Sequence, residues 1–151
     1  MTNNNHPISK LDFLLGIWNL EYRIPKSVFS EEDKGSGSGE FKRILNDEYV
    51  SFNYEAKLSS IELSAHAVFA WDEKSKSYRF WWFESSGNFL TASCNFINDD
   101  TLGLNWHDSL LVQTFKKESV DKIVLQMKYP VNDNKYETIL EVILMRKIMN
   151  S

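Results

Sequence analysis

Apolar and polar residues alternate with a period of two along almost the whole chain, a pattern typical of strands with one buried face. The segment 18–24 shows it clearly, because Trp18, Leu20, Tyr22 and Ile24 alternate with polar side chains. Similar segments follow one another, separated by short polar turns. We expect strands at about 18–24, 40–45, 48–57, 62–71, 78–84, 88–96, 101–107, 110–117, 122–129 and 135–147.

Helical spacing occurs convincingly once, from Ile8 to Leu15. Ser9 is the expected N-cap, Asp12 falls in the first turn, and Gly16 ends the helix. The segment therefore predicts a short helix that plugs the fold with one apolar face, made of Ile8, Leu11, Phe13, Leu14 and Leu15.

The stretch 25–39, PKSVFSEEDKGSGSG, is polar, then acidic, then rich in glycine. This composition predicts a mobile surface loop, the longest connection in the chain. The glycines suggest a phosphate loop at first sight. A strand follows them rather than a helix N-terminus, however, so we do not expect phosphate binding.

Short consecutive strands joined by tight turns, without crossover helices, pair as antiparallel neighbours. Closure into a barrel removes the exposed edges that such a meander leaves. We therefore predict an all-β fold, an up-and-down antiparallel closed barrel of about ten strands with a short N-terminal helix, as a single domain over 1–151. A β-sandwich is the alternative, although no long crossing connection is visible.

Five aromatic side chains fall within six positions in YRFWWFES, 78–85, so both faces of this strand are apolar. A four-residue turn before it sets the register with the preceding strand. That register places the more apolar set inside the barrel, namely Leu63, Ala65, Ala67, Phe69, Trp71, Tyr78, Phe80, Trp82 and Glu84.

The opposite face of these two strands carries Val68, Trp81 and Phe83. An exposed apolar patch on a soluble protein usually marks a contact surface. We expect either a homodimer through Trp81 and Phe83, or a loop or helix of the same chain that covers them.

The formal net charge of −4 offers no basic surface for nucleic acid or for an anionic membrane, so we expect neither partner. Cys94 is the single cysteine, which excludes an intramolecular disulfide. The first ten residues lack a signal-peptide pattern and no window is long and apolar enough to span a membrane. We expect a cytoplasmic protein.

The ordered motifs FLLGIW, GSGSGEFKRIL, YRFWWFES and MRK resemble the calycin superfamily of lipocalins and fatty-acid-binding proteins. They are also similar to an uncharacterised bacterial family of lipocalin-like domains, domain-of-unknown-function family 1579, over nearly the whole chain. The resemblance implies a lumen that binds small hydrophobic molecules. It also implies that Arg146 stacks on Trp18 to close the barrel floor. The loop 25–39 would then form a lid over the open end, with Val28 and Phe29 able to dip inward. The absence of a disulfide and of a signal peptide argues against an extracellular carrier.

Three polar residues are candidates for chemistry inside the lumen. Arg43 could bind a ligand carboxylate, as arginines do in some fatty-acid-binding barrels. The alternative is an arginine that faces solvent or forms a structural pair with another residue of the protein. Glu84 lies beyond Trp82, where burial would raise the pKa of its carboxyl, unless the strand end is in water. His107 ends a strand and could face the barrel mouth.

We expect no metal and no cofactor. His6, His66 and His107 are far apart, and no cysteine cluster accompanies them. Haem-binding nitrobindin-like barrels of the superfamily hold haem through a histidine near the chain end, and none follows His107 here, so haem is a minor alternative. No Gly-x-Ser-x-Gly nucleophile motif occurs.

The sequence thus predicts intracellular binding of a small hydrophobic or amphipathic ligand in the lumen, with Arg43, Phe69, Trp71, Tyr78, Phe80, Trp82, Glu84 and His107 as candidate contacts. One alternative is an enzyme that uses Glu84 or His107 as acid or base. Another is a filled barrel that acts as a dimer or partner module. An open, apolar cavity would favour the carrier. A carboxylate or histidine in the cavity would favour the enzyme, and a barrel without a cavity would favour the surface role.

Overall fold

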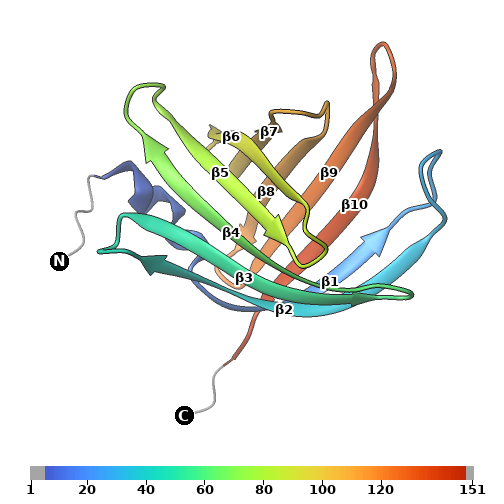
Figure 1. Cartoon of the computed structure of the whole chain (residues 1–151), viewed down its shortest axis with the longest axis horizontal. Helices are drawn as coiled ribbons and strands as arrows, with labels where there is room; N and C mark the ends of the chain where they lie inside the picture. The colour runs from blue at the N-terminus through green and yellow to red at the C-terminus, as the bar shows by residue number, and fades with distance from the viewer. Residues whose placement is uncertain (1–5, 149–151) are drawn as a thin grey trace.

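Ten antiparallel strands close into a barrel in the computed structural model, which describes residues 6–148 (Figure 1). Each strand pairs with the next along the chain, and β1 pairs with β10 to close the ring. The predicted closed barrel is therefore confirmed. The elements are η1 (Pro7–Leu14), β1 (Gly16–Ile24), β2 (Asp33–Ile44), β3 (Tyr49–Leu58), β4 (Glu62–Asp72), β5 (Ser77–Glu84), β6 (Phe89–Asn98), β7 (Thr101–Trp106), β8 (Val112–Ser119), β9 (Lys122–Asn132) and β10 (Lys135–Arg146).

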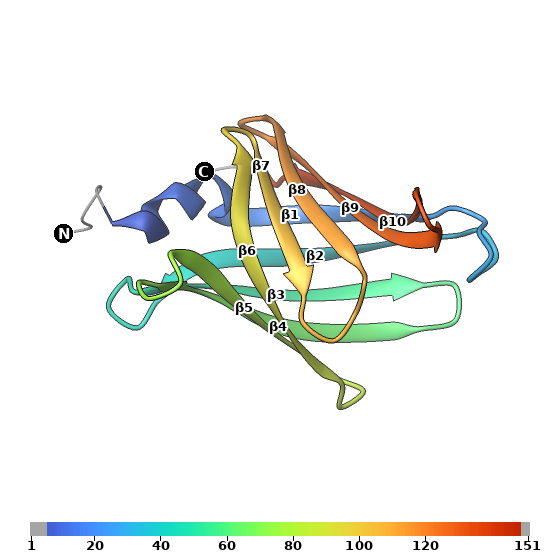
Figure 2. The same cartoon turned by 90° about the horizontal axis from the view of Figure 1, so that it is seen from above.

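The short helix η1 lies at one end of the barrel (Figure 2). It is a 3-10 helix, and its buried residues Ile8, Leu11 and Leu14 recur every third position, which matches three residues per turn. The N-cap is His6, whose Nδ1 accepts a hydrogen bond from the Ile8 backbone N–H at 3.1 Å. The prediction of Ser9 as N-cap was wrong, because the helix begins at Pro7 and its N-cap lies three residues before Ser9.

The helix η1 is the only helix within residues 6–148, and eight residues are too few to cross a lipid bilayer.

Trp18 and Arg146 form the floor of the barrel beside η1. Trp18 is fully buried, and its Nε1 donates a hydrogen bond to the Leu14 carbonyl at 2.7 Å. The Arg146 guanidinium lies 4.2 Å from the centroid of the Trp18 ring and donates to the Leu15 carbonyl at 2.6 Å. Gly16 has φ +129°, and a Cβ there would collide with this guanidinium. The stacking implied by the resemblance is confirmed.

The glycine-rich stretch belongs to β2, so the prediction of a loop through residue 39 was wrong. Gly35, Gly37 and Gly39 share the inward face of β2 with the buried Phe41. A Cβ at Gly37 would collide with the carbonyl oxygen of Glu55 on β3. Glycine at alternate positions therefore lets β2 and β3 approach closely. The glycine content alone suggests a flexible loop, because it does not reveal this contact between strands.

The predicted register between β4 and β5 is confirmed. Trp71 pairs with Tyr78, Phe69 with Phe80, and Ala67 with Trp82. Aromatic and small side chains on this inward face join one core cluster that continues to η1.

Candidate ligand-binding site in the barrel lumen

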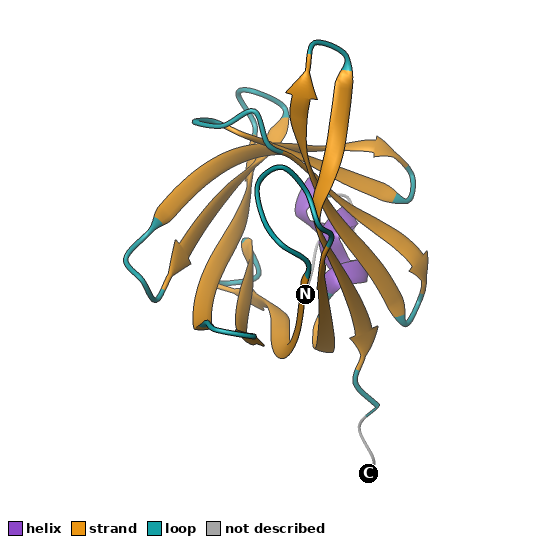
Figure 3. Ribbon diagram, turned by 90° about the vertical axis from the view of Figure 1, so that its right-hand side faces the viewer, coloured by secondary structure: helices purple, strands orange, loops and turns teal. Residues whose placement is uncertain are grey.

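A cavity of about 350 Å³ occupies the lumen. Its lining includes Ile24, Leu58, Leu63 and Leu111, which lie near strand ends remote from η1. Figure 3 looks at the barrel from that end, with η1 at the far side. Every strand except β2 contributes a side chain to the wall, because the inward positions of β2 nearest this end are glycines.

Among residues 6–148, no Asp, Glu, Lys, Arg or His side chain lines the cavity. Aliphatic and aromatic groups make up most of its wall, and the polar atoms come from tyrosine hydroxyls, indole N–H groups and one amide, that of Gln113. A charged ligand would lose its hydration here without a counter-charge in the wall. The cavity is therefore suited to molecules that are apolar over most of their surface.

Two hydrogen bonds fix the aromatic side of the cavity. Trp82 Nε1 donates to the Tyr54 hydroxyl oxygen at 2.8 Å, and Trp106 Nε1 donates to Gln113 Oε1 at 3.2 Å. The Trp106 ring also meets Phe80 edge to face, with centroids 5.6 Å apart. These contacts hold flat apolar surfaces in place before any ligand arrives.

Burial keeps the lumen phenols neutral. It raises the pKa of Tyr22 well above its ordinary value, with a further contribution from Tyr54 nearby. Burial also raises the pKa of Tyr54, although the hydrogen bond from Trp82 opposes the shift. Both hydroxyls therefore keep their protons near neutral pH and can donate hydrogen bonds.

The predicted aromatic contacts divide into two groups. Phe80 and Trp82 line the cavity. Phe69, Trp71 and Tyr78 share their inward face but are absent from the cavity wall. Burial raises the pKa of Tyr78 to about 12, and its hydroxyl donates to the Pro7 carbonyl at 2.6 Å. These three residues thus belong to the packed end of the barrel beside η1.

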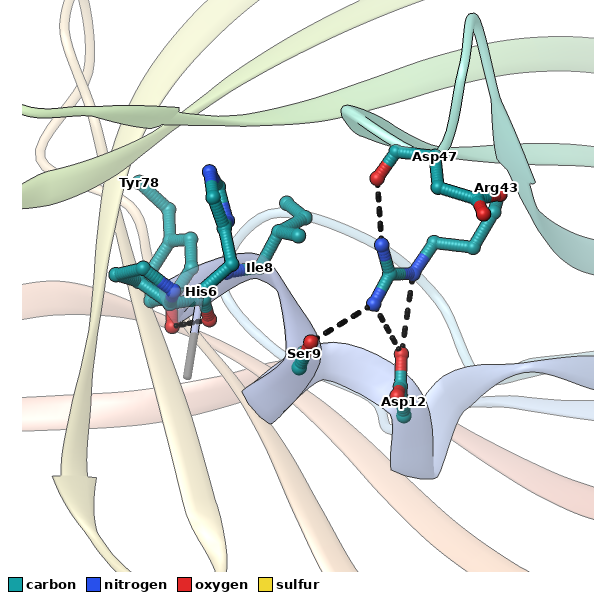
Figure 4. Close-up of polar contacts among 8 residues, drawn as sticks. His6, Ile8, Ser9, Asp12, Arg43, Asp47 and Tyr78 are labelled. Atoms are coloured by element: carbon teal, nitrogen blue, oxygen red, sulfur yellow. Dashed lines mark hydrogen bonds and ion pairs between the residues drawn. The ribbon is translucent and has the colours of Figure 1, made fainter. Parts of the chain in front are cut away.

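Arg43 does not reach the lumen, so the expectation that it meets a ligand carboxylate was wrong. Its Nη2 donates to Ser9 Oγ at 3.1 Å and to Asp12 Oδ1 at 2.9 Å, and its Nη1 donates to the Asp47 carbonyl at 2.5 Å (Figure 4). Arg43 therefore fastens η1 to the turn between β2 and β3. This is the structural pairing that the sequence left as an alternative.

Replacing Arg43 with methionine should lower the free energy of unfolding by about 1–2 kcal/mol, because Ser9, Asp12 and the Asp47 carbonyl lose a shared donor at a partly exposed site. Chemical denaturation measures this, with Lys42→Met on the exposed side of the same strand as the control. Loss of lumen binding at unchanged stability would show that Arg43 acts on the ligand instead.

His107 points away from the lumen, contrary to expectation. Its Nδ1 lies 2.8 Å from Thr91 Oγ1 and its Nε2 lies 2.8 Å from Ser93 Oγ. Trp106, the last residue of β7, points inward to the cavity, and His107 follows it on the outer surface beside Thr91 and Ser93.

Glu84 also lies outside the cavity wall. It ends β5, accepts a hydrogen bond from Ser86 Oγ at 2.5 Å, and lines a shallow surface groove of about 690 Å³ together with Phe83 and His66. The strand-end position that the sequence left as an alternative is therefore the one observed. Neither candidate acid or base, Glu84 or His107, lines the lumen.

The loop at the open end spans 25–32 and differs from the predicted lid. Val28 is 79% exposed, so its expected inward position is wrong. Phe29 is 53% exposed and meets Tyr129 of β9 edge to face, with centroids 5.1 Å apart. The loop leans on the strand β9 instead of inserting both apolar side chains.

Four residues that bring polar groups to the cavity wall were not predicted as ligand contacts from the sequence: Tyr22, Tyr54, Trp106 and Gln113. The signal was present for Gln113, which occupies the same face of its strand as the buried Phe115. A glutamine at an inward position of an otherwise apolar strand face indicates a specific hydrogen-bonding role. Within 6–148, no three His, Cys, Asp or Glu side chains gather to hold a metal ion.

The sequence matches no protein-family model and no curated protein. Among solved structures, the barrel is similar to Rv2717c from M. tuberculosis, with a TM-score of 0.64 and 10% identity over 94% of this chain and 98% of that one. It is similar to the S-type phycobiliprotein lyase CPES from Guillardia theta, with a TM-score of 0.57 and 9% identity over 94% and 93%. A de novo designed fluorescence-activating β-barrel gives a TM-score of 0.51 and 12% identity over 97% and 100%. The shared feature is a lipocalin-like β-barrel fold.

Proposed function

We propose that this chain is an intracellular binding protein that holds one small hydrophobic or amphipathic molecule in the lumen of its barrel. The observation that carries the proposal is the cavity of about 350 Å³ with largely apolar walls. Small-molecule sites typically measure about 300–1000 Å³ and combine apolar walls with a few placed polar groups. The lumen fits the lower end of that range, which suits a single compact ligand.

The fold supports the same role. It is shared with a barrel designed to activate fluorescence and with a phycobiliprotein lyase, and those names describe those proteins alone. The motifs that resemble domain-of-unknown-function family 1579 lead us to propose membership of that family. A lumen enzyme is less well supported, because neither Glu84 nor His107 lines the cavity.

Fluorescence titration with N-phenyl-1-naphthylamine tests the proposal. We expect saturable one-to-one binding that quenches tryptophan emission, because Trp82 and Trp106 line the cavity. Leu140→Trp should weaken binding at least about tenfold by filling the lumen. Met145→Trp is the matched control, since Met145 lies on the same strand and is 45% exposed. Equal binding by both variants would place the probe outside the lumen.

We also propose self-association through the outer face of β4, β5 and β6. Phe83 and Phe89 form a cross-strand pair on this face and are 47% and 69% exposed, and Trp81 lies half-buried on the same face of β5. Exposed aromatic pairs of this kind favour a contact with a second copy of the same surface.

Phe83→Ser should shift the sedimentation profile toward the monomer while lumen binding of the naphthylamine probe stays unchanged. Phe29→Ser, at an exposed phenylalanine elsewhere on the surface, serves as the control. A profile that is identical for the wild type and Phe83→Ser would exclude this interface.

A further inference from the structure

Two polar groups in the cavity wall have no hydrogen-bond partner within residues 6–148. They are the hydroxyl of Tyr22 and the amide nitrogen of Gln113, on residues that are 9% and 3% exposed. Fully enclosed side-chain nitrogen and oxygen atoms in the described part of the chain all have partners. These two groups therefore reach open space, and the space beside both residues is the lumen cavity.

The orientation of the Gln113 amide follows from its neighbour. Trp106 Nε1 can only donate a hydrogen bond, so the group that faces it at 3.2 Å must be the Gln113 oxygen. The amide NH₂ group then points away from Trp106 and offers its N–H groups to the lumen. The hydrogen bond from Trp106 thus fixes the orientation of the Gln113 amide, with its NH₂ group as a donor toward the lumen.

Tyr54 adds a third donor to the same cavity. Its oxygen already accepts from Trp82 Nε1 at 2.8 Å, which leaves its own O–H proton to be donated. The Tyr22 hydroxyl also carries a proton near neutral pH, since burial raises the pKa of this phenol. Within the described part of the chain, the lumen therefore presents several neutral donors and no charged side chain.

We propose that the lumen selects an uncharged molecule that carries a hydrogen-bond acceptor, of the ketone, aldehyde or ester class, and that Gln113 and Tyr22 donate to it. This inference rests on the proposed function and names the class of ligand. An acceptor satisfies the unpaired donors, whereas a hydrocarbon leaves them unpaired in an apolar setting. A carboxylate would lie buried without a positive partner, because no Lys, Arg or His among the described residues lines the cavity.

Three naphthalenes of similar shape test this selectivity by displacing N-phenyl-1-naphthylamine near neutral pH. They are 2-acetylnaphthalene, with a neutral acceptor, 2-ethylnaphthalene, without one, and 2-naphthoate, with a charge. We expect the ketone and the hydrocarbon to compete with the probe, and the carboxylate to bind roughly 100-fold more weakly than the ketone.

The variants Gln113→Leu and Tyr22→Phe assign the donors. Each should weaken binding of 2-acetylnaphthalene by about 3- to 10-fold, while affinity for 2-ethylnaphthalene stays the same or rises. Retained 2-ethylnaphthalene binding also shows that the variant is folded. The two residues lie on different strands, β1 and β8. If one variant fails to fold, the other still tests whether a lumen donor binds the ketone.

Two results would overturn the inference: 2-naphthoate binding as tightly as the ketone, or a ratio of ketone to hydrocarbon affinity that neither variant changes. In both cases competition by 2-ethylnaphthalene would leave the proposed function intact. Failure of the probe and of all three naphthalenes to bind would instead overturn the proposed function itself.

Discussion

Replacing Trp18 with alanine should lower the free energy of unfolding by about 3–5 kcal/mol. Trp18 is fully buried where η1 meets β1 and β10. Its loss would leave a cavity at the closed end, remove the hydrogen bond to the Leu14 carbonyl, and take away the surface on which Arg146 lies. The large effect follows because one side chain joins the helix and the two strands that close the barrel.

Urea denaturation followed by circular dichroism measures this loss. Trp81→Ala is the matched control, since Trp81 is half-buried on the outer face and its loss should cost only about 1 kcal/mol. Equal losses for the two variants would show that Trp18 has no special role in closing the barrel.

Replacing Gly37 with valine should destabilise the protein by about 3 kcal/mol or more, because inserting atoms into a packed site forces the surrounding structure to move. The new Cβ would meet the carbonyl oxygen of Glu55 and the Cα of Ala56. Both are backbone atoms of β3, so neither can turn aside as a flexible side chain could. The pairing of β2 with β3 would have to separate locally.

Ser36→Val is the control for Gly37→Val, because Ser36 is exposed on the outward face of the same strand and should change stability by less than about 0.5 kcal/mol. The same denaturation experiment compares the two variants. If Gly37→Val were tolerated as well as Ser36→Val, residues 35–39 would behave as the loop that their composition suggests.

The strands could be predicted because apolar side chains recur at every second position. The short turns between them then favoured antiparallel neighbours that close into a barrel. The pattern also indicated the register of β4 and β5, since one four-residue turn determines every later pair. The contact between Trp18 and Arg146 came from the resemblance to calycins, and it could not have been predicted from local periodicity across 128 positions of separation. The two residues are direct partners in the pairing of β1 with β10.

Other features depend on contacts that the local sequence does not contain. Glycine favours loops in general, and only the close approach of β3 makes Gly37 a strand residue. Arg43 lies on β2 and its partner Asp12 lies on η1, 31 residues earlier, so its orientation follows from how the helix docks. The size of the lumen cavity is likewise a property of packed volumes, which a list of aromatic residues cannot give.

The sequence did not indicate the polar side of the site, because the candidates it offers for chemistry are acids, bases and cations. The groups that face the cavity are neutral, Tyr22, Tyr54 and Gln113 among them. They matter because each keeps a hydrogen-bond donor available to a ligand. For Tyr54 and Gln113 this follows only from the hydrogen bonds that they accept from Trp82 and Trp106. Neutral donors in an apolar cavity provide orientation without requiring a charged ligand.

A crystal structure of the protein with N-phenyl-1-naphthylamine tests the central claim most directly. The account predicts electron density for one probe molecule inside the barrel, in contact with Trp82, Trp106 and Leu140. Density confined to the surface groove beside Phe83, or a lumen filled by its own side chains while the probe binds in solution, would contradict it.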